Sequence, residues 1–192
     1  MPRAGLSAER VVERAAQIVD EHGLEELSLS RLAANLGVAP PSLYKHVSGM
    51  SDLVRGVSVR AVDELADHLA ASVMGLAGPD ALRALANAYR GFARAHPGLY
   101  PMTQVPVEAS DRSLSPLRSS AAQRTVAIVT AALAGYRIPD DRIIDAVRMT
   151  RASLHGFVDI EVRGGFAMNA PIDVSFATLV DSLDAALLAL GE

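Results

Sequence analysis

LSRLAANLGVAPPSLYKHVSGMSDLV, residues 29–54, is the stretch that decides the fold. Its opening part places Leu and Ala at the spacing of one helix face, which predicts a helix over residues 29–36. Ser28 precedes this helix and is suited to cap its first backbone amides. Gly37 follows at the point where the helix should end.

A second, shorter helix is predicted over residues 41–47. Pro41 suits its first position, and Leu43 and Val47 stand four residues apart, so that both should face inward. Two helices joined by a short glycine-containing turn form a helix-turn-helix, whose second helix fits the major groove of DNA. The outward side chains of that second helix are Ser42, Tyr44, Lys45 and His46.

The same stretch resembles the DNA-binding domain of the TetR (tetracycline-repressor-like) transcriptional regulators. The resemblance rests on an LA-x2-LGV core, then SLY-x-H-V, then a new helix capped by Ser51. A separate helix that begins near Ser7 precedes them, and the match covers the first third of the chain. Met50 departs from the family, which usually has a phosphate-binding Lys at the start of its fourth helix.

This resemblance implies that the motif contacts double-stranded DNA. Ser42 and Lys45 are the candidates for base edges because they share an exposed helix face. Tyr44 is expected to contact a phosphate, although its ring could instead pack on the first helix. His46 either donates to a phosphate or caps its own helix, and Arg31 either lies on the DNA backbone or is simply solvated. The DNA-binding candidates are Ser28, Arg31, Pro41, Ser42, Tyr44, Lys45, His46 and Ser51.

Composition narrows the class of protein. Half of the 192 residues are hydrophobic, yet no apolar run reaches the roughly 18 residues of a membrane helix. The absence of cysteine excludes disulfides, thiolate zinc sites and cysteine nucleophiles. We therefore expect a soluble, cytoplasmic protein.

The charge balance argues against bulk electrostatic attraction to nucleic acid, because the net charge is −4. Residues 1–60 hold seven Lys/Arg and seven Asp/Glu. DNA affinity would then have to come from local placement of cations and helix ends. Lys45, the only lysine in the chain, lies on the expected recognition helix.

The rest of the chain is predicted to be helical, without a convincing strand. The expected fold is all-α with about nine helices. A three-helix DNA-binding domain over residues 1–50 is joined by a long fourth helix to a helical ligand-binding and dimerisation domain over residues 51–192. The first helix should start at Ser7 and end at Gly23, and residues 110–120 are the most loop-like region.

The end of the chain, which includes LHGFVDIEVRGGFAMN, resembles one C-terminal domain type of the same family, in which a His-Gly pair and a later Gly-Phe are usual. That resemblance implies a pocket for an unknown small apolar effector, whereas taken alone the aromatic residues here fit an ordinary core. The ligand-binding candidates are Tyr89, Phe92, His96, Tyr100, Met102, Met149, His155, Phe157 and Phe166.

Apolar stripes on the last two helices predict a homodimer, because they exceed what one terminal helix pair should hide. The competing interpretation is that these side chains pack within one subunit. Gly156, inside a helix, should permit the close approach of a partner helix, a bend or a ligand. The dimer-interface candidates are Leu154, Val158, Leu179, Leu183 and Leu187.

No metal site, cofactor or catalytic site is predicted, since His155 and Asp159, four residues apart on a helix, are too few for one. The favoured function is a ligand-responsive regulator, a repressor released from its operator by the effector. One alternative is a helical small-molecule carrier or enzyme that has lost DNA binding. Another is a regulator controlled by a protein partner.

Overall fold

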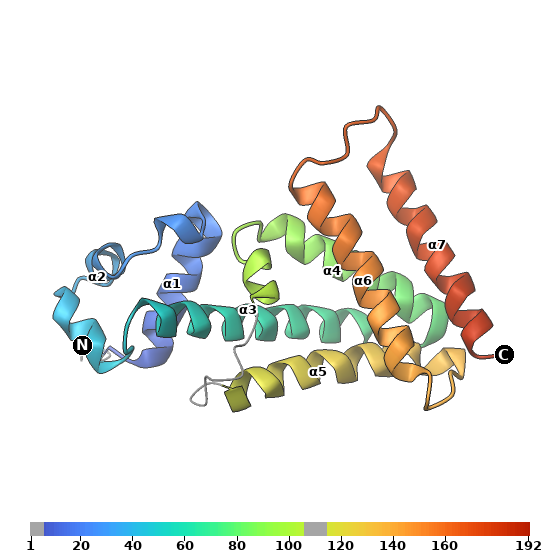
Figure 1. The fold of residues 1–192 in the computed structure, drawn as a ribbon, viewed down its shortest axis with the longest axis horizontal. Helices are drawn as coiled ribbons and strands as arrows, with labels where there is room; N and C mark the ends of the chain where they lie inside the picture. The colour runs from blue at the N-terminus through green and yellow to red at the C-terminus, as the bar shows by residue number, and fades with distance from the viewer. Residues whose placement is uncertain (1–5, 106–114) are drawn as a thin grey trace. The chain divides into compact units, whose positions relative to one another are not determined.

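The computed structural model describes residues 6–105 and 115–192, with only the backbone described for residues 115–119. These parts of the chain are helical and contain no strand, which confirms the all-α fold (Figure 1). The α-helices are α1 (Ala8–His22), α2 (Leu29–Leu36), α3 (Met50–Val73), α4 (Gly78–Ala95), α5 (Ser115–Leu133), α6 (Ile143–Val162) and α7 (Ile172–Leu190). The 3-10 helices are η1 (Leu24–Glu26), η2 (Pro40–Lys45), η3 (Tyr100–Gln104) and η4 (Ala134–Tyr136).

Three local predictions need correction. The second helix of the motif is the 3-10 helix η2, and it begins at Pro40. Ser51 does not cap the following helix, because α3 already begins at Met50. The expected loop is helical from Ser115 onward, since a proline such as Pro116 is tolerated in the first turn of a helix. The remainder of that loop prediction, residues 110–114, lies outside the described residues.

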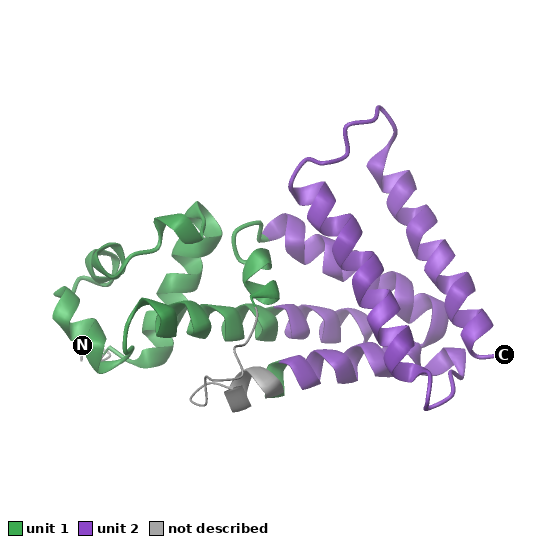
Figure 2. Cartoon of the chain, in the orientation of Figure 1, with its two compact units in different colours: residues 1–64, 96–121 green, residues 65–95, 122–192 purple. Residues whose placement is uncertain are grey.

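The chain forms two compact units (Figure 2). Unit 1 comprises residues 1–64 and 96–121, and unit 2 comprises residues 65–95 and 122–192. The long helix α3 is therefore continuous from one unit into the other, and a second boundary between the units falls directly after the end of α4. The functional boundary expected at residue 50 stays a prediction. In the described part of the chain, no helix is long and apolar enough to span a membrane.

The core of unit 1 follows from amphipathic helices with well-formed ends. Ser7 and Ser28 each accept a hydrogen bond from the backbone N–H three residues on, both at 3.2 Å, as predicted for α1 and α2. Gly37 ends α2 in the left-handed conformation, with φ of 67°, which favours glycine. The buried apolar side chains include Val11, Ala15, Ile18, Val19, Leu32, Ala33, Leu43, Val47, Leu53 and Val57.

The segment after α4 packs tightly on α1 within unit 1. The carboxylate of Asp20 lies 2.6 Å from His96 Nδ1, and its other oxygen accepts the Leu99 backbone N–H at 3.1 Å. A Cβ on Gly98 would lie 2.1 Å from the carbonyl oxygen of Val19, so only glycine fits there. Tyr100 and Met102 of η3 are buried in the same core, and the Ser58 hydroxyl of α3 donates to the Met102 carbonyl at 2.7 Å.

Unit 2 packs α4 against α6 and α7. At one end of unit 2, the backbones of Gly78 and Gly135 pack closely together. A Cβ on Gly135 would lie 2.6 Å from the backbone nitrogen of Gly78, so a side chain has no room there. The buried Tyr136 donates its hydroxyl to Asp184 of α7. Burial and that hydrogen bond raise the pKa of Tyr136, so the phenol stays protonated throughout the ordinary pH range.

The start of α3 is held by Asp52. Its carboxylate accepts the Ser48 backbone N–H at 2.8 Å and lies 3.3 Å from Arg55 Nη2. The hydrogen bond from Ser48 is the main reason that the pKa of Asp52 lies below its ordinary value. This carboxylate therefore fixes the connector between η2 and α3 while it is ionised.

Gly98→Ala should destabilise the protein by about 2 kcal/mol, because the added methyl group has no room against α1. Gly91→Ala is the matched control: Gly91 lies exposed inside α4, and an added methyl group would have no atom within 4 Å, so this change should stabilise by up to about 1 kcal/mol. Urea unfolding of both variants measures the difference. Equal stabilities would show that the segment does not pack closely on α1.

Asp52→Asn should lower the free energy of unfolding at neutral pH by about 1 kcal/mol, the usual worth of a helix-start cap. Because folding lowers the pKa of Asp52, its contribution is present above the unfolded-state value of about 3.9 and is lost as the pH falls. Wild type and variant should therefore converge in stability in acid. Thermal melts from pH 3 to pH 7 check this, and a difference that persists unchanged at pH 3 would contradict it.

Candidate nucleic-acid interface and ligand-binding residues

The helix η2 presents a polar face because two apolar residues anchor it. Leu43 and Val47 are buried, as predicted, while Tyr44 is 59% exposed and Lys45 and Pro41 are exposed. Ser42 and His46 are half-buried. Because Tyr44 is 59% exposed, much of its side chain is accessible to a partner such as DNA.

His46 forms the C-terminal cap position of η2, and its backbone N–H donates to the Leu43 carbonyl at 2.8 Å. The Val47 N–H donates to the same carbonyl at 3.0 Å. These bonds and the buried Leu43 fix a helix that is too short to be stable by itself. The outward side chains therefore stand on a backbone held by the rest of unit 1.

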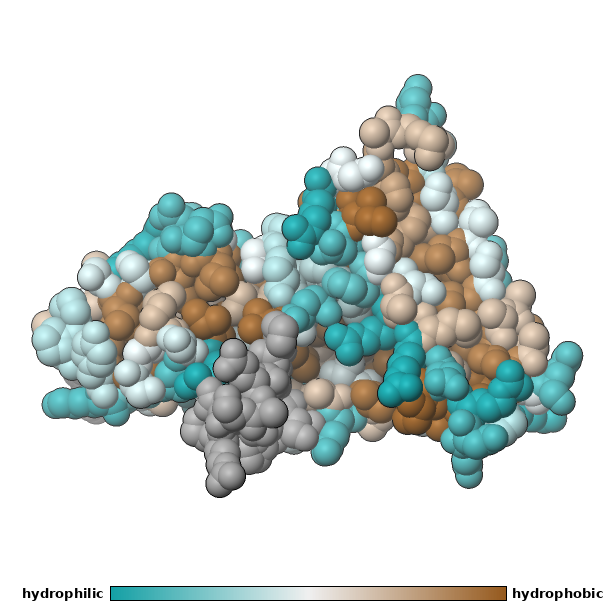
Figure 3. Space-filling model, in the orientation of Figure 1, coloured by the Kyte–Doolittle hydropathy of each residue, from teal (hydrophilic) through white to brown (hydrophobic). Residues whose placement is uncertain are grey.

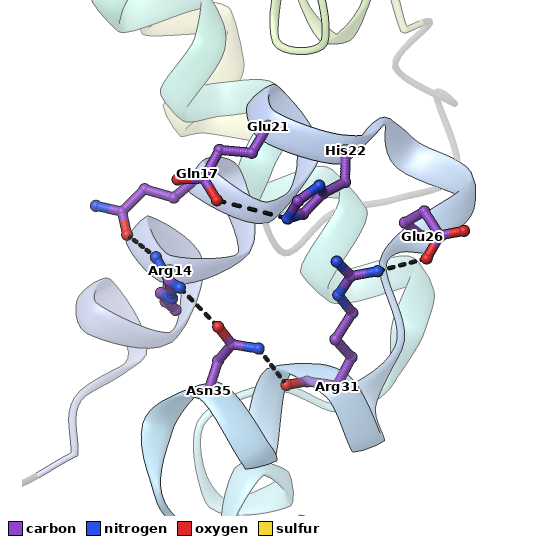
Figure 4. A network of polar contacts seen from close by, with 7 residues as sticks. All are labelled: Arg14, Gln17, Glu21, His22, Glu26, Arg31 and Asn35. Atoms are coloured by element: carbon purple, nitrogen blue, oxygen red, sulfur yellow. Dashed lines mark hydrogen bonds and ion pairs between the residues drawn. The ribbon is translucent and has the colours of Figure 1, made fainter.

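The two cations of the motif differ in their surroundings. Lys45 has no ion-pair partner among the described residues. Arg31, in the first turn of α2, is paired with Glu26 of η1, so it is not simply solvated (Figure 4). The charge of Lys45 is thus available to bind an anion, whereas the charge of Arg31 is already paired with the carboxylate of Glu26.

The helix starts near the motif are partly satisfied internally. The Ser28 hydroxyl accepts the Arg31 N–H, which leaves the hydroxyl hydrogen of Ser28 for another partner. Ser51 is exposed in the first turn of α3, beside the half-buried Met50. Amides at such a helix start, together with Ser51, have the chemistry to hold a phosphate.

The nine ligand-binding candidates do not form one cluster within either unit. His96, Tyr100 and Met102 belong to unit 1, where the latter two are core residues and His96 faces Asp20. Unit 2 brings Phe157 and Phe166 together, with ring centroids 4.7 Å apart. The other candidates in unit 2 are Tyr89 and Phe92, both buried on α4, and Met149 and His155, both half-buried on α6.

An ion cluster in unit 2 was not predicted. Arg90 of α4 is buried and donates two hydrogen bonds to Glu161 of α6, at 2.7 and 2.6 Å, and one to Asp173 of α7 at 2.7 Å. Its guanidinium lies 4.7 Å from the centre of the Phe176 ring, which in turn lies 5.2 Å from that of Phe157. The hydrogen bonds to Glu161 are the main cause of the raised pKa of Arg90.

The sequence did contain a signal for Arg90. It continues the helical stripe of Leu82, Ala86, Tyr89 and Ala93, all of which are buried. A charged residue on such a stripe must find partners, because burying an unpaired charge is costly. The partners could not be named from sequence, since Glu161 and Asp173 are 71 and 83 residues away.

The dimer-interface candidates are mostly core residues of a single chain. Leu154, Val158, Leu183 and Leu187 are buried without any partner subunit, and Leu179 is half-buried. Most of these side chains are therefore hidden within one subunit, as in the competing interpretation, because α4 packs against both helices. Apart from its chain neighbours and its own helix backbone, no atom of the described residues would lie within 4 Å of a Cβ at Gly156, so no other described helix requires a glycine there.

Two family models match the chain. The model described as bacterial regulatory proteins of the tetR family matches residues 11–57, and the model of the tetracyclin repressor-like C-terminal domain matches residues 82–183. Together they cover the helix-turn-helix and most of unit 2. The second match alone extends over more than half of the chain.

Similar proteins agree with these matches. An uncharacterised HTH-type transcriptional regulator of Mycobacterium tuberculosis is 36% identical over 162 residues, which cover 84% of this chain and 72% of that protein. Another from Bacillus subtilis is 33% identical over 167 residues, covering 86% and 84%. The crystal structure of a TetR variant from Acinetobacter baumannii in complex with minocycline has the same fold, with a TM-score of 0.68, 18% identity, and 98% and 99% of the two chains covered. This chain belongs to the TetR family of bacterial transcriptional regulators.

Proposed function

We propose that this regulator binds a double-stranded DNA operator as a homodimer, represses transcription, and is released by a small apolar effector. The observation that carries the proposal is the exposed face of η2, where Tyr44 and Lys45 stand on an anchored backbone. A side chain on a preformed element contacts a groove without the cost of ordering the backbone, which favours binding.

DNA recognition is assigned to the motif and the helix starts beside it. Lys45 and Ser42 would read base edges, and Tyr44 would donate its hydroxyl to a phosphate. Ser28, Pro41, His46 and Ser51 would contact the DNA backbone, and Arg31 would do so where it exchanges Glu26 for a phosphate. Met50 offers a phosphate no charge, so DNA affinity would depend on few cations and should change only modestly with salt.

Effector binding is assigned to unit 2. The A. baumannii protein binds minocycline in its crystal structure. In this chain, the neighbouring rings of Phe157, Phe166 and Phe176 supply the kind of apolar surface that a small hydrophobic effector would need. A carrier or enzyme without DNA binding is disfavoured, because the exposed η2 face has the residues that the regulator needs.

Dimer formation is assigned to the exposed faces of α6 and α7. Hydrophobic side chains reach the surface over these helices (Figure 3), including Ile160 of α6 and Val174 and Leu188 of α7. Ala185 lies between Val174 and Leu188 on the exposed face of α7. Gly156 has no side chain and so leaves space over α6. Small residues among exposed apolar ones permit two helix pairs to approach closely. A two-fold axis there would present two copies of η2 to one operator, about 34–36 Å apart on one face of the DNA.

Lys45→Ala should weaken operator binding without changing thermal stability, because Lys45 is exposed and has no ion-pair partner among the described residues. If Lys45 contacts a base, its loss should cost about 1–3 kcal/mol of binding free energy and relax the sequence preference at one position.

Tyr44→Phe should weaken binding to all DNA sequences alike, since it removes only a donor to a phosphate. Fluorescence anisotropy against DNA from upstream of the chain's own gene measures both. Arg94→Ala, which removes an exposed positive charge in unit 2, is the control. Unchanged affinity in both motif variants would remove η2 from the interface.

Ala185→Arg should give folded monomers that lose operator affinity, because the exposed site tolerates arginine in one subunit but two charges would meet across the interface. Ala127→Arg, at an exposed position of α5, should remain dimeric. Sedimentation velocity at micromolar concentration distinguishes the two. Leu183→Glu cannot serve here, since it places a charge in the core of one chain. A monomeric wild type would contradict the dimer.

A further inference from the structure

The ion pair between Arg31 and Glu26 lies on the surface of the helix-turn-helix. Arg31 Nη1 contacts Glu26 Oε2, and the two side chains are 34% and 56% exposed (Figure 4). We propose that Glu26 is an internal competitor that holds Arg31 back from a DNA phosphate, and so sets both the affinity for the operator and its salt dependence. This inference rests on the proposed function in DNA binding.

The backbone of Arg31 is fixed, while its side chain has freedom to exchange partners. The Arg31 N–H donates to Ser28 Oγ at 3.2 Å, and its carbonyl accepts from Asn35 Nδ2 at 2.9 Å. The Asn35 side chain is itself held by Arg14, whose Nη2 donates to Asn35 Oδ1 at 2.6 Å. Arg31 can therefore change its anion without any movement of α2.

A carboxylate and a phosphate compete for the same guanidinium. Both are anions that accept charge-assisted hydrogen bonds from arginine. The Glu26 pair is only partly shielded from water, so it contributes little to stability and is weakened by salt. The pair is therefore not needed for folding, yet it neutralises a cation in the first turn of α2.

Lys45 and Glu25 show that the pairing is specific to Glu26. Lys45 has no acidic partner among the described residues, so its charge is not opposed in this way. Glu25 stands next to Glu26 in η1 and is also exposed, but it forms no ion pair in the described part of the chain. Residues 1–60 hold equal numbers of acidic and basic residues. Whether a given cation is already paired with a carboxylate therefore affects the attraction of this region to DNA.

The experiment compares Glu26→Gln with Glu25→Gln, each measured by fluorescence anisotropy with operator DNA over a series of salt concentrations. Each variant removes one negative charge from the same turn, but only the first releases Arg31. We expect Glu26→Gln to tighten binding about two- to fivefold beyond Glu25→Gln at low salt, the worth of an exposed ion pair. The slope of log affinity against log salt should steepen by about one for one added phosphate contact.

The same pair of changes in an Arg31→Gln background provides the second test. Without the guanidinium, Glu26→Gln and Glu25→Gln should have equal effects, because nothing remains to be released. Circular dichroism melts should show all variants folded, since each altered side chain is on the surface.

Equal affinities and equal salt slopes for the two single variants, with the wild type binding its operator, would overturn the inference alone. A Glu26→Gln advantage that survives in the Arg31→Gln background would also overturn it, because the effect would not pass through Arg31. If neither wild type nor any variant prefers operator to unrelated DNA, the proposed function fails, and the role of Glu26 fails with it.

Discussion

The burial of Leu43 and Val47 is the interaction on which η2, and with it the proposed DNA-binding face, depends. A six-residue 3-10 helix has too few internal hydrogen bonds to persist in water, so η2 exists only because unit 1 receives these two side chains. The same burial determines which residues remain outside. Tyr44 and Lys45 face solvent because the inward positions are taken by leucine and valine.

Unit 1 needs more than the helix-turn-helix to build its core. The segment that follows α4 supplies Tyr100 and Met102, and Asp20 binds it through both carboxylate oxygens. α4, which carries Arg90, ends at Ala95, directly before this segment.

Most of the fold could be predicted from local chemistry. Ser7, Ser28 and Gly37 begin or end their helices as expected, because caps and left-handed turns depend on nearby residues. Packing between helices that are far apart in the sequence was harder to predict. The burial of Leu183 and Leu187 depends on α4, and the partners of Arg90 lie on helices far along the chain. The geometry of η2 was also missed, since residues 41–47 have the spacing of an α-helix, whereas the structure has a 3-10 helix over Pro40–Lys45 with one buried residue, Leu43. The DNA-binding candidates were placed by resemblance and remain predictions, as do the ligand-binding residues.

Hydrogen exchange of the whole chain, with and without operator DNA, tests most directly the claim that η2 and the adjoining helix starts form the interface. Amides that contact DNA exchange more slowly in the complex, and the measurement needs no substitution. We expect protection concentrated between residues 28 and 54, with the largest change in η2 and the first turn of α3. Protection confined to unit 2, with η2 unchanged in the presence of bound DNA, would contradict it.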